Sequence, residues 1–364
     1  MTVAGAAARD ILVWGAGAIG ATVAAYLSRA GHRVTCVDTA AAHREAIAAH
    51  GLRISGPVDQ FTARVAVSSP EDLRGTWPLA IVAVKAHHST EAAKALKDHL
   101  KPDASVITLQ NGLCYADVGA VVGHDRVYAG MVGFAADVLE PGHVRFGKRG
   151  DLAVGKPGSA IDARLNDIVD LIRIFEPDAV ATDRIDAFLW GKLGFVAILY
   201  GTAVGMSPLA VLLKDPRFFP VWYQLAGELM AVADAEDIVP ESYDNFALTS
   251  FRFGQNPDAA REGLIASANA AGPNAKPHSG MWRDLNVHRR RTEIDAQLVP
   301  VVRLGNSRGL PCRMLDRVCT MIHEIEAGTR AQSDDSLLEL LALADEAAIT
   351  EFRPSQSVSS KRGP

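Results

Sequence analysis

Along the first half of the chain, short apolar runs alternate with amphipathic stretches of helical length. Continuous apolar runs are typical of buried parallel strands, whereas a repeat of 3.6 residues indicates helices. The pattern predicts strands at Ile11–Trp14, Arg33–Val37, Gly51–Ser55, Thr62–Val67, Leu79–Val84, Ser105–Leu109, Arg126–Ala129, His143–Phe146, Leu152–Val154 and Ala179–Ala181, and helices at Ala18–Ala30, Ala41–His50, Ser89–Leu100 and Ala160–Phe175. Strands that alternate with helices predict an α/β fold with a doubly wound, Rossmann-type parallel sheet.

From Asp183 onward the pattern changes to long helical segments with few strand signals. Candidate helices cover Arg184–Val204, Arg217–Glu236, Trp282–Leu304 and Leu315–Ala327. The last residues are polar and rich in serine, which is typical of a disordered segment. We therefore predict an α/β domain at 1–182, an all-α domain at 183–345 and a disordered tail at 346–364.

The first predicted strand runs directly into a glycine-rich turn and a helix, with the sequence Gly15-Ala-Gly17-Ala18-Ile19-Gly20. In a dinucleotide-binding turn, the first glycine makes the tight turn, the second lets the backbone approach a pyrophosphate, and the third lets the helix pack closely on the strand. The N–H groups at the helix start, those of Ala18 and Ile19 among them, then favour phosphate. A second strand ends in Asp38, at the spacing that this motif requires. We expect residues 1–182 to bind a dinucleotide.

Polar side chains follow three predicted strands, at the carboxyl edge where ligands bind in such sheets. Asp38 can accept hydrogen bonds from both ribose hydroxyls of NAD and repels the 2′-phosphate of NADP, although Arg44 nearby could pair with that phosphate. We therefore favour NAD over NADP. Lys85 is a candidate for cofactor binding, and the Asn111 amide for the nicotinamide carboxamide or a substrate hydroxyl. Each residue also has an interpretation without a ligand: Asp38 as an acidic turn residue, Lys85 as an ordinary exposed lysine, and Asn111 as part of an Asn-Gly turn.

Lys192 lies in the otherwise apolar helical segment Phe188–Tyr200. A lysine in such surroundings either extends its ammonium to solvent or has a chemical role. Burial disfavours the charged form, which would make Lys192 a usable proton donor near neutral pH. Glu293 stands beside arginines, and its role is ambiguous, because a charged helix face next to arginines is usually a solvated ion-pair face.

Composition and charge narrow the class of protein. With 364 residues, 48% of them hydrophobic, the chain can form about two globular domains. The formal net charge is −5, and the basic cluster Arg289–Arg291 falls inside a predicted helix, so we expect no nucleic-acid partner. We find no unbroken apolar run of about 18 residues and no signal-peptide core, and expect a cytoplasmic protein without a membrane span. Four scattered cysteines and the adjacent His87–His88 lack the spacing of a metal site.

Five motifs together resemble the ketopantoate reductase (2-dehydropantoate 2-reductase) family. They are the glycine-rich start, Val84–Ala86, Leu109–Gly112, Trp190–Leu193 and Arg291–Asp295. The resemblance implies a Rossmann domain followed by a helical domain like the C-terminal domain of 6-phosphogluconate dehydrogenase, and reduction of a 2-keto acid by a nicotinamide cofactor. It implies that Lys192 protonates the ketone oxygen, that Glu293 positions the substrate or the lysine, that Asn111 contacts nicotinamide and substrate, and that Lys85 contacts the cofactor. It also carries the expectation of a homodimer.

The chain departs from the family pattern at several positions. Val196 and Tyr200 stand where the family places asparagines, one and two turns after its lysine, and Ser279–Met281 replaces a serine pair before methionine. The segment between Asp284 and Glu293 is one residue longer than usual, and Asp38 stands where a basic residue for NADP is expected. Changed polar groups alter which substrate an enzyme accepts.

We therefore predict an NAD(P)-dependent oxidoreductase that acts on a 2-keto acid and 2-hydroxy acid pair, either 2-dehydropantoate or a related small molecule. Its predicted substrate contacts are Asn111, Ser279 and Tyr200, and no metal is expected. Two alternatives stay open. One is a dehydrogenase for an opine or a 3-hydroxy acid, and the other is a non-catalytic dinucleotide-binding sensor, which the missing asparagines favour.

Overall fold

The computed structural model describes residues 7–270 and 277–351, and the chain divides into two compact units. Unit 1 contains the residues up to Leu193, together with Glu236–Ala247 and Asp295–Pro300. Unit 2 contains Gly194–Ala235, Leu248–Ile294 and the residues from Val301 onward. The chain passes from one unit to the other inside helix α6 (Ile185–Ala203), and the segments from later in the chain that join unit 1 have no signal in the sequence.

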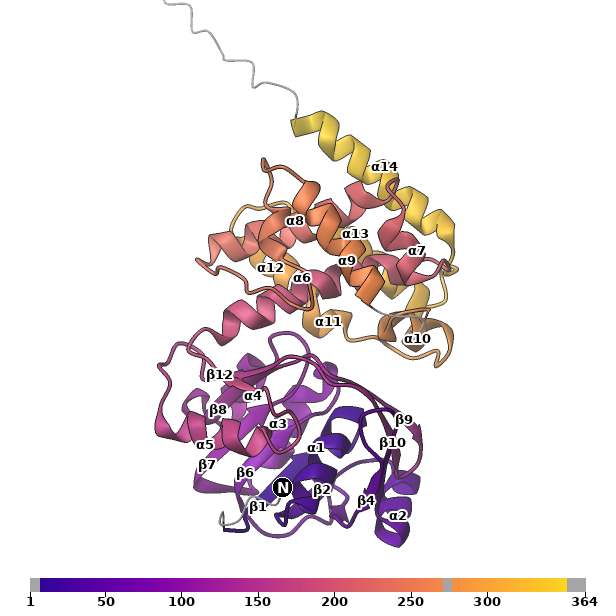
Figure 1. Cartoon of the computed structure of the whole chain (residues 1–364). Coiled ribbons are helices and arrows are strands. Elements are labelled where there is room, and N and C mark those ends of the chain that lie inside the picture. Colours follow the sequence, from indigo (N-terminus) through magenta and orange to yellow (C-terminus); the bar gives the residue numbers. More distant parts are fainter. Residues whose placement is uncertain (1–6, 271–276, 352–364) are drawn as a thin grey trace, which may run out of the picture. The chain divides into compact units, whose positions relative to one another are not determined.

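Unit 1 is built on a sheet that has eight strands in the described part of the chain, in the order β12-β11-β8-β7-β6-β1-β2-β5 (Figure 1). The central parallel strands are β1 (Asp10–Trp14), β2 (Arg33–Val37), β6 (Trp77–Val82), β7 (Leu100–Thr108) and β8 (Val127–Val132). Short strands extend both edges, namely β5 (Ala66–Ser68), β11 (Leu152–Gly155) and β12 (Val180–Ala181), of which β11 is antiparallel to β8. Strand order reverses at β1, the switch point at which such sheets bind ligands.

Helices bury both faces of this sheet. They are α1 (Ala18–Arg29), α2 (Ala41–His50), α3 (Ser89–Lys97), α4 (Tyr115–Val122) and α5 (Ala163–Ile172), with 3₁₀ turns η1 (Ala86–His88) and η2 (His124–Arg126). Along β1, Ile11 and Val13 join the core that contains residues of α1 and α5, whereas Leu12 and Trp14 join the core that contains residues of α3 and α4. This alternation buries β1 on both sides and confirms the predicted doubly wound fold.

A second, four-stranded sheet in unit 1 was not predicted. Its order is β4-β3-β10-β9, with β3 (Leu52–Ser55), β4 (Phe61–Ala63), β9 (Ala135–Glu140) and β10 (His143–Lys148). The single strand predicted at Thr62–Val67 is wrong, because this stretch forms parts of β4 and β5, which pair in different sheets. The small sheet packs on α1, where the Tyr26 ring meets Phe61 and Phe146 edge-on with centroids 5.0 and 5.9 Å apart.

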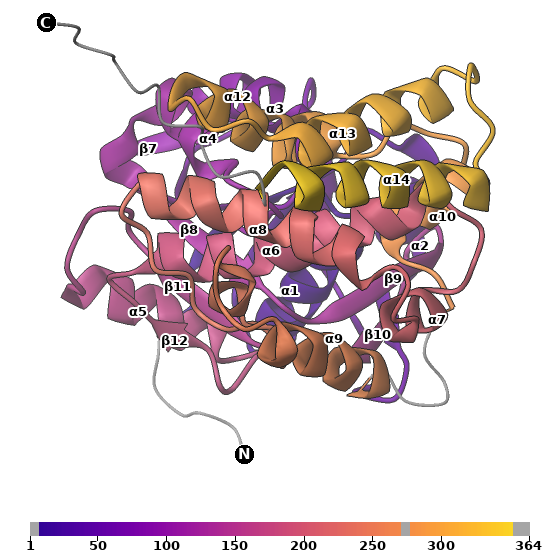
Figure 2. The same cartoon turned by 90° about the horizontal axis from the view of Figure 1, so that it is seen from above.

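Unit 2 is helical in its described residues. Beyond α6 it holds α7 (Leu209–Lys214), α8 (Phe219–Ala235), η3 (Leu248–Phe251), α9 (Asp258–Ala270), α10 (Gly280–Asn286), most of α12 (Val299–Ser307), α13 (Arg313–Glu326) and α14 (Asp334–Glu351). Helix α8 packs against α13 and α14, which also contact each other (Figure 2). This confirms a helical C-terminal part.

The single helix predicted at Trp282–Leu304 is wrong. Helix α10 ends at Asn286, and α11 (Ile294–Gln297) and α12 follow after a loop in which Arg289 has a positive φ of 48°. The Arg290 guanidinium donates to Asp284 Oδ1 at 2.6 Å, and the Arg290 N–H donates to the Asp284 carbonyl at 2.9 Å. These contacts turn the chain back onto α10, so Arg289–Arg291 lies in a loop rather than on a helix.

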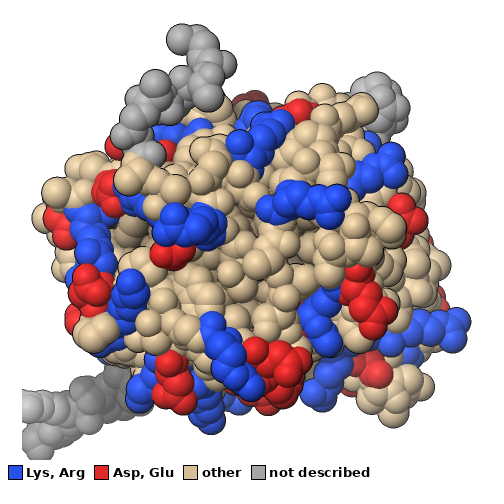
Figure 3. All heavy atoms as spheres, turned by 90° about the horizontal axis from the view of Figure 1, so that it is seen from below, with Lys and Arg blue, Asp and Glu red and all other residues tan. Residues whose placement is uncertain are grey.

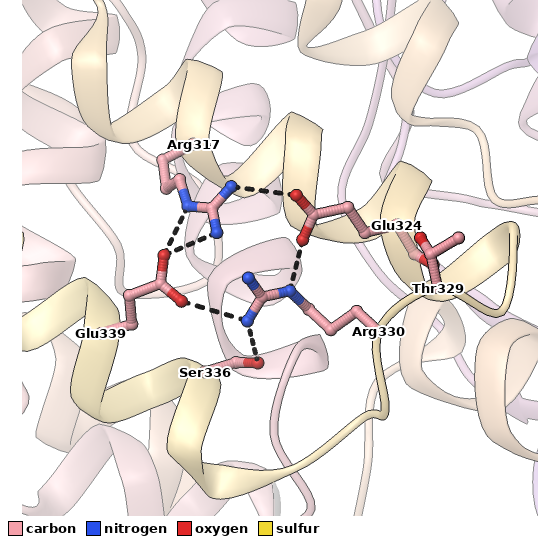
Figure 4. A network of polar contacts seen from close by, with 6 residues as sticks. All are labelled: Arg317, Glu324, Thr329, Arg330, Ser336 and Glu339. Atoms are coloured by element: carbon pink, nitrogen blue, oxygen red, sulfur yellow. Dashed lines mark hydrogen bonds and ion pairs between the residues drawn. The ribbon is translucent and has the colours of Figure 1, made fainter.

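Ion pairs join α13, the turn after it and α14 (Figure 4). Arg317 donates to Glu339 at 2.7 Å and to Glu324 at 3.2 Å, and Arg330 pairs with the same two carboxylates. Helix α14 buries Leu337, Leu340 and Ala344 on one face and continues to Glu351. Residues 346–351 are therefore helical where disorder was predicted, and the rest of that predicted tail lies outside the described residues.

Helix α6 is long and apolar. Among the residues described, it alone is long and apolar enough to cross a membrane by composition, and 72% of the relevant window is buried inside the structure. Asp186 and Lys192 interrupt it, which is why no unbroken apolar run stands out in the sequence. Burial of this extent is also the property of a core helix.

On the face drawn in Figure 3, side chains of both charge signs are intermixed.

Candidate active site

The glycine-rich turn between β1 and α1 requires glycine at two of its three glycine positions. Gly15 has a φ of 97°, and a Cβ there would lie 2.8 Å from the Val84 nitrogen, so only glycine fits. A Cβ on Gly20 would collide with the Gly15 carbonyl oxygen. Gly17, in contrast, has no atom within 4 Å of such a Cβ, and it places no side-chain cap on α1. No N-cap side chain therefore accepts from the first N–H groups of α1, those of Ala18 and Ile19.

The Asp38 carboxylate lies beside this turn. Its Oδ2 accepts from the Ala16 N–H at 3.0 Å, and its Oδ1 accepts from the Ala40 N–H at 2.9 Å. Arg44 donates to the Asp38 carbonyl oxygen at 2.9 Å, so the guanidinium lies near the same strand end. A carboxylate oxygen has two acceptor sites, and Asp38 therefore keeps capacity for further donors.

His43 also holds the turn, and sequence reasoning missed it. Its Nδ1 accepts from the Gly142 N–H at 3.0 Å, so Nε2 carries the proton and donates to the Ala16 carbonyl at 2.8 Å. Ala16 is thus fixed at both its N–H and its carbonyl. The only signal in the sequence is that His43 and Ile47 share one face of α2, the face that is buried.

Lys192 and Asn111, 81 residues apart, meet at the carboxyl edge of the main sheet. The half-buried Lys192 Nζ donates to Asn111 Oδ1 at 2.6 Å and also to the carbonyl oxygen of Val132, the last residue of β8. Helix α6 lies directly against the backbone at Glu241, where a Cβ on Gly191 would collide with the Glu241 carbonyl. The pair therefore joins α6 to the ends of two adjacent strands.

Tyr243 lies near the Lys192 ammonium, and the sequence did not predict a place for it in the site. The Lys192 ammonium lies 5.8 Å from the centre of its ring. Burial, together with the nearby Asp244 charge, raises the pKa of Tyr243 to about 12, so the phenol is protonated near neutral pH. Tyr243 and Gly133 also line a small cavity of about 220 Å³, with Lys148 and Asp151 on its wall.

Lys85 is exposed and begins the 3₁₀ turn after β6. The neighbouring loop is tied to it by Gln110, whose amide nitrogen donates to the Val84 carbonyl at 3.0 Å and to Ser89 Oγ at 2.8 Å. The loops that carry Lys85 and Asn111 are therefore joined by hydrogen bonds. Cofactor binding by Lys85 stays a prediction.

In unit 2, Tyr200 and Glu293 are neighbours. Tyr200 is fully buried, and its pKa is raised well above the usual value, first by burial and then by the Glu293 charge. Thr292 and the Glu293 backbone lie close to the Tyr200 hydroxyl, which has no hydrogen bond of good geometry among the described residues. The half-buried Glu293 follows Thr292, whose N–H and hydroxyl both donate to Glu326 at 2.8 Å.

Ser279 has a structural explanation in the same unit. Its side chain caps α10 by accepting from the Trp282 N–H at 3.2 Å. The Trp282 indole donates to the Gly205 carbonyl at 2.9 Å and stacks on His278 with ring centres 3.7 Å apart. A substrate contact from Ser279 would have to share this capping oxygen, and it stays a prediction.

In the part of the chain that the structure describes, no group of three or more His, Cys, Asp or Glu side chains is placed to hold a metal ion. The four cysteines are buried.

Comparisons with known proteins agree with this architecture. Residues 11–159 match the family model described as ketopantoate reductase PanE/ApbA, and residues 184–326 match the model of the C-terminal part. This chain belongs to the ketopantoate reductase family. The family confirms the predicted resemblance, and the protein is a nicotinamide-dependent oxidoreductase that acts on CH–OH groups.

The relatives extend over nearly the whole length. The 2-dehydropantoate 2-reductases of Mesorhizobium japonicum and Archaeoglobus fulgidus are each 26% identical, and the alignments cover 86% and 87% of this chain and 97% and 98% of theirs. Among solved structures, a PanE/ApbA family ketopantoate reductase from Ralstonia eutropha JMP134 has a TM-score of 0.73 at 25% identity, over 88% of this chain and 99% of that one. A D-mandelate dehydrogenase with NADH and anilino(oxo)acetate has a TM-score of 0.76 at 22% identity, with the same coverage, and shows the shared fold.

Proposed function

We propose that the protein reduces a 2-keto acid to a 2-hydroxy acid with NADH, and that Lys192 supplies the proton. The observation that carries this proposal is the 2.6 Å hydrogen bond from Lys192 Nζ to Asn111 Oδ1 at the carboxyl edge of the dinucleotide-binding sheet. An ammonium held there stands where the reacting end of a dinucleotide is expected, beyond the strand ends and away from the glycine-rich turn.

A nicotinamide cofactor, when bound, would supply the hydride for the carbonyl carbon. Negative charge then develops on the carbonyl oxygen, and an ammonium both stabilises that charge and donates a proton to it. Asn111 and the Val132 carbonyl hold Nζ from two sides, which fixes the direction of the ammonium. The half-buried ring of Tyr243, with its phenol protonated, lies 5.8 Å from the lysine ammonium. In the oxidative direction, the neutral amine of Lys192 accepts the hydroxyl proton.

Asp38 supports NAD rather than NADP as the cofactor. Its carboxylate is held at the end of β2 by the Ala16 and Ala40 N–H groups, where it would accept the hydroxyls of an adenosine ribose. A 2′-phosphate would bring a second negative charge against it. The D-mandelate dehydrogenase of the same fold was solved with NADH, which fits this choice.

For the substrate, we propose 2-dehydropantoate or a related keto acid with a more apolar side chain. The curated relatives are 2-dehydropantoate 2-reductases. Val196 and Tyr200 on α6 are 4% and 0% exposed, however, and neither offers the amide of an asparagine. A site that lacks such donors gives up much of its selection for a substrate hydroxyl.

The test is NADH consumption by the purified protein with 2-dehydropantoate, benzoylformate, a 3-keto acid and an opine precursor pair. We expect turnover with a 2-keto acid that falls about 100-fold or more in Lys192→Met, while the Kd for NADH changes little. Lys214→Met, on an exposed lysine at the end of α7, serves as the control with unchanged activity.

Three outcomes would contradict the proposal in different ways. Turnover confined to the 3-keto acid or to the opine precursors would support the corresponding alternative dehydrogenase. NADH binding without turnover of any substrate would support a dinucleotide-binding sensor. Undiminished turnover in Lys192→Met would remove the lysine from the mechanism.

A further inference from the structure

Gln297, the last residue of α11, has a buried side-chain amide without a protein partner. The residue is 1% exposed, and within the described ranges neither Nε2 nor Oε1 has a hydrogen bond. Leaving a buried polar group unsatisfied costs about 1–3 kcal/mol, and native proteins rarely leave two on one side chain. Gln110 nearby is also buried, but its amide nitrogen bonds Val84 and Ser89. Gln297 therefore has two hydrogen-bonding atoms that the fold itself does not use.

The loop after β7 packs against the Gln297 side chain. A Cβ on Gly112 would lie 3.1 Å from Gln297 Cγ and 3.3 Å from the Ala296 carbonyl, so α11 packs directly on the loop backbone. Gly112 also has a positive φ of 80°, which excludes most other residues here. Gln297 thus lies against the Asn111–Gly112 turn, next to the residue that holds Lys192.

The order of the strands indicates which half of a dinucleotide faces this turn. The glycine-rich turn follows β1, and Asp38 follows β2 on one side of it. The strands on the other side of β1 are β6 and then β7. If Asp38 takes the adenosine ribose, the pyrophosphate crosses over β1 and the nicotinamide lies toward β6 and β7. Asn111 and Gln297 stand at that end.

We propose that Gln297 binds the carboxamide of the nicotinamide, with Oε1 accepting from the carboxamide N–H and Nε2 donating to its carbonyl. This inference rests on the proposed nicotinamide-dependent reduction. A side-chain amide carries a donor and an acceptor side by side, which is the complement of a primary carboxamide. Asn111, the residue that the sequence suggested for this contact, already gives its amide oxygen to Lys192 at 2.6 Å. Gln297 takes over the carboxamide and thereby fixes which face of the ring is turned to the substrate.

The test is a cycle that combines a variant with a cofactor analogue. The reduced 3-acetylpyridine analogue of NADH replaces the carboxamide NH₂ by a methyl group and keeps the carbonyl. We expect the wild-type protein to bind NADH about tenfold more tightly than the analogue. Gln297→Met, which keeps the length of the side chain and removes both polar atoms, should bind NADH about tenfold more weakly and discriminate less than about twofold.

Two further variants separate binding from packing. Gln297→Glu keeps an acceptor for the carboxamide N–H and should retain most of the discrimination between NADH and the analogue. This variant also tests the inference if Gln297→Met folds poorly. Gln110→Met is the matched control: it breaks buried bonds inside the protein and should lower the melting temperature without changing the ratio of the two affinities.

An unchanged ratio in Gln297→Met would overturn the inference, because the amide would then bond water or serve packing alone. An analogue that binds the wild-type protein as tightly as NADH would overturn it as well. Failure of the wild-type protein to bind either dinucleotide would instead contradict the proposed function, so the two failures are distinguishable.

Discussion

Lys192 Nζ lies 2.6 Å from Asn111 Oδ1, and the two residues come from α6 and from the loop after β7. The Val132 carbonyl, at the end of the adjacent strand β8, accepts from the same ammonium. Because its acceptors come from the ends of two parallel strands, the sheet as well as the helix sets the direction of the lysine. A flexible side chain is thereby held in one orientation before a substrate arrives.

We expect Asn111→Ala to lower kcat about 10- to 100-fold, since a hydrogen bond to a charged group contributes about 1.5–3 kcal/mol. The Kd for NADH should change much less than kcat, because the variant frees the lysine rather than removing the glycine-rich turn. Both constants are measured on the same preparation, with Asn166→Ala on the exposed face of α5 as the control. An unaltered kcat would mean that Asn111 is only a turn residue.

The sequence was sufficient for the elements whose burial follows from their own pattern. The apolar run of β1 is buried as predicted, and Gly15 and Gly20 lie in the tight turn and the close packing that their spacing predicts. The approach of a pyrophosphate at Gly17 stays a prediction. Thr62–Val67 shows where this reasoning stops. Nothing local tells that Ala63 pairs in the small sheet and Ala66 in the large one, because pairing is decided by distant strands.

The same distinction holds for the candidate site. Asn111 and Lys192 were predicted separately, from a strand end and from an apolar helix, and the structure adds their contact. Tyr243 and Gln297 had no signal in the sequence, since they reach unit 1 from segments far along the chain. The loop at Arg289 was not predicted, because it depends on the hydrogen bond from Arg290 to Asp284 on α10. A helical repeat in the sequence does not reveal such a contact.

Cofactor choice depends on Asp38. We expect the wild-type protein to bind NADH at least about tenfold more tightly than NADPH, because the carboxylate accepts ribose hydroxyls and repels a 2′-phosphate. Asp38→Ser should weaken NADH about tenfold and narrow or reverse this preference. The measurement is the Kd of both reduced dinucleotides at fixed ionic strength, since salt screens the repulsion.

Arg44→Ala provides the control for that experiment. Its guanidinium bonds the Asp38 carbonyl rather than the carboxylate, so the variant should leave NADH affinity nearly unchanged. A wild-type preference for NADPH that is lost in Arg44→Ala would assign the 2′-phosphate to Arg44 and contradict the choice of NAD.

Gly17 and Gly20 should separate ligand binding from folding. A methyl group at Gly17 meets no atom within 4 Å and suits an extended backbone, so Gly17→Ala should keep its melting temperature and weaken NADH about tenfold or more. A methyl group at Gly20 collides with the Gly15 carbonyl, so Gly20→Ala should lose at least about 2 kcal/mol of stability. Equal effects of the two substitutions on NADH affinity and on stability would contradict separate roles for the two glycines.

Glu228 predicts how stability depends on pH. This carboxylate on α8 is 4% exposed and accepts from the Met314 and Leu315 N–H groups at 2.9 Å each, at the start of α13. Burial nevertheless raises its pKa from 4.5 to about 6. The folded protein thus holds this proton more tightly than the unfolded chain does. The resulting stabilisation is fully present below pH 4.5 and is lost as the pH rises through about 6, by about 2 kcal/mol.

Glu228→Gln isolates this effect, because glutamine resembles the protonated carboxyl at every pH. We expect the stability of the variant relative to the wild type to increase by about 2 kcal/mol between acidic and neutral pH, measured by urea unfolding across the range. All other titrating groups are shared and cancel in the difference. Glu262→Gln, on an exposed residue of α9, should show no such trend. A difference for Glu228→Gln that does not vary with pH would show that the two N–H groups compensate the burial of the charge completely.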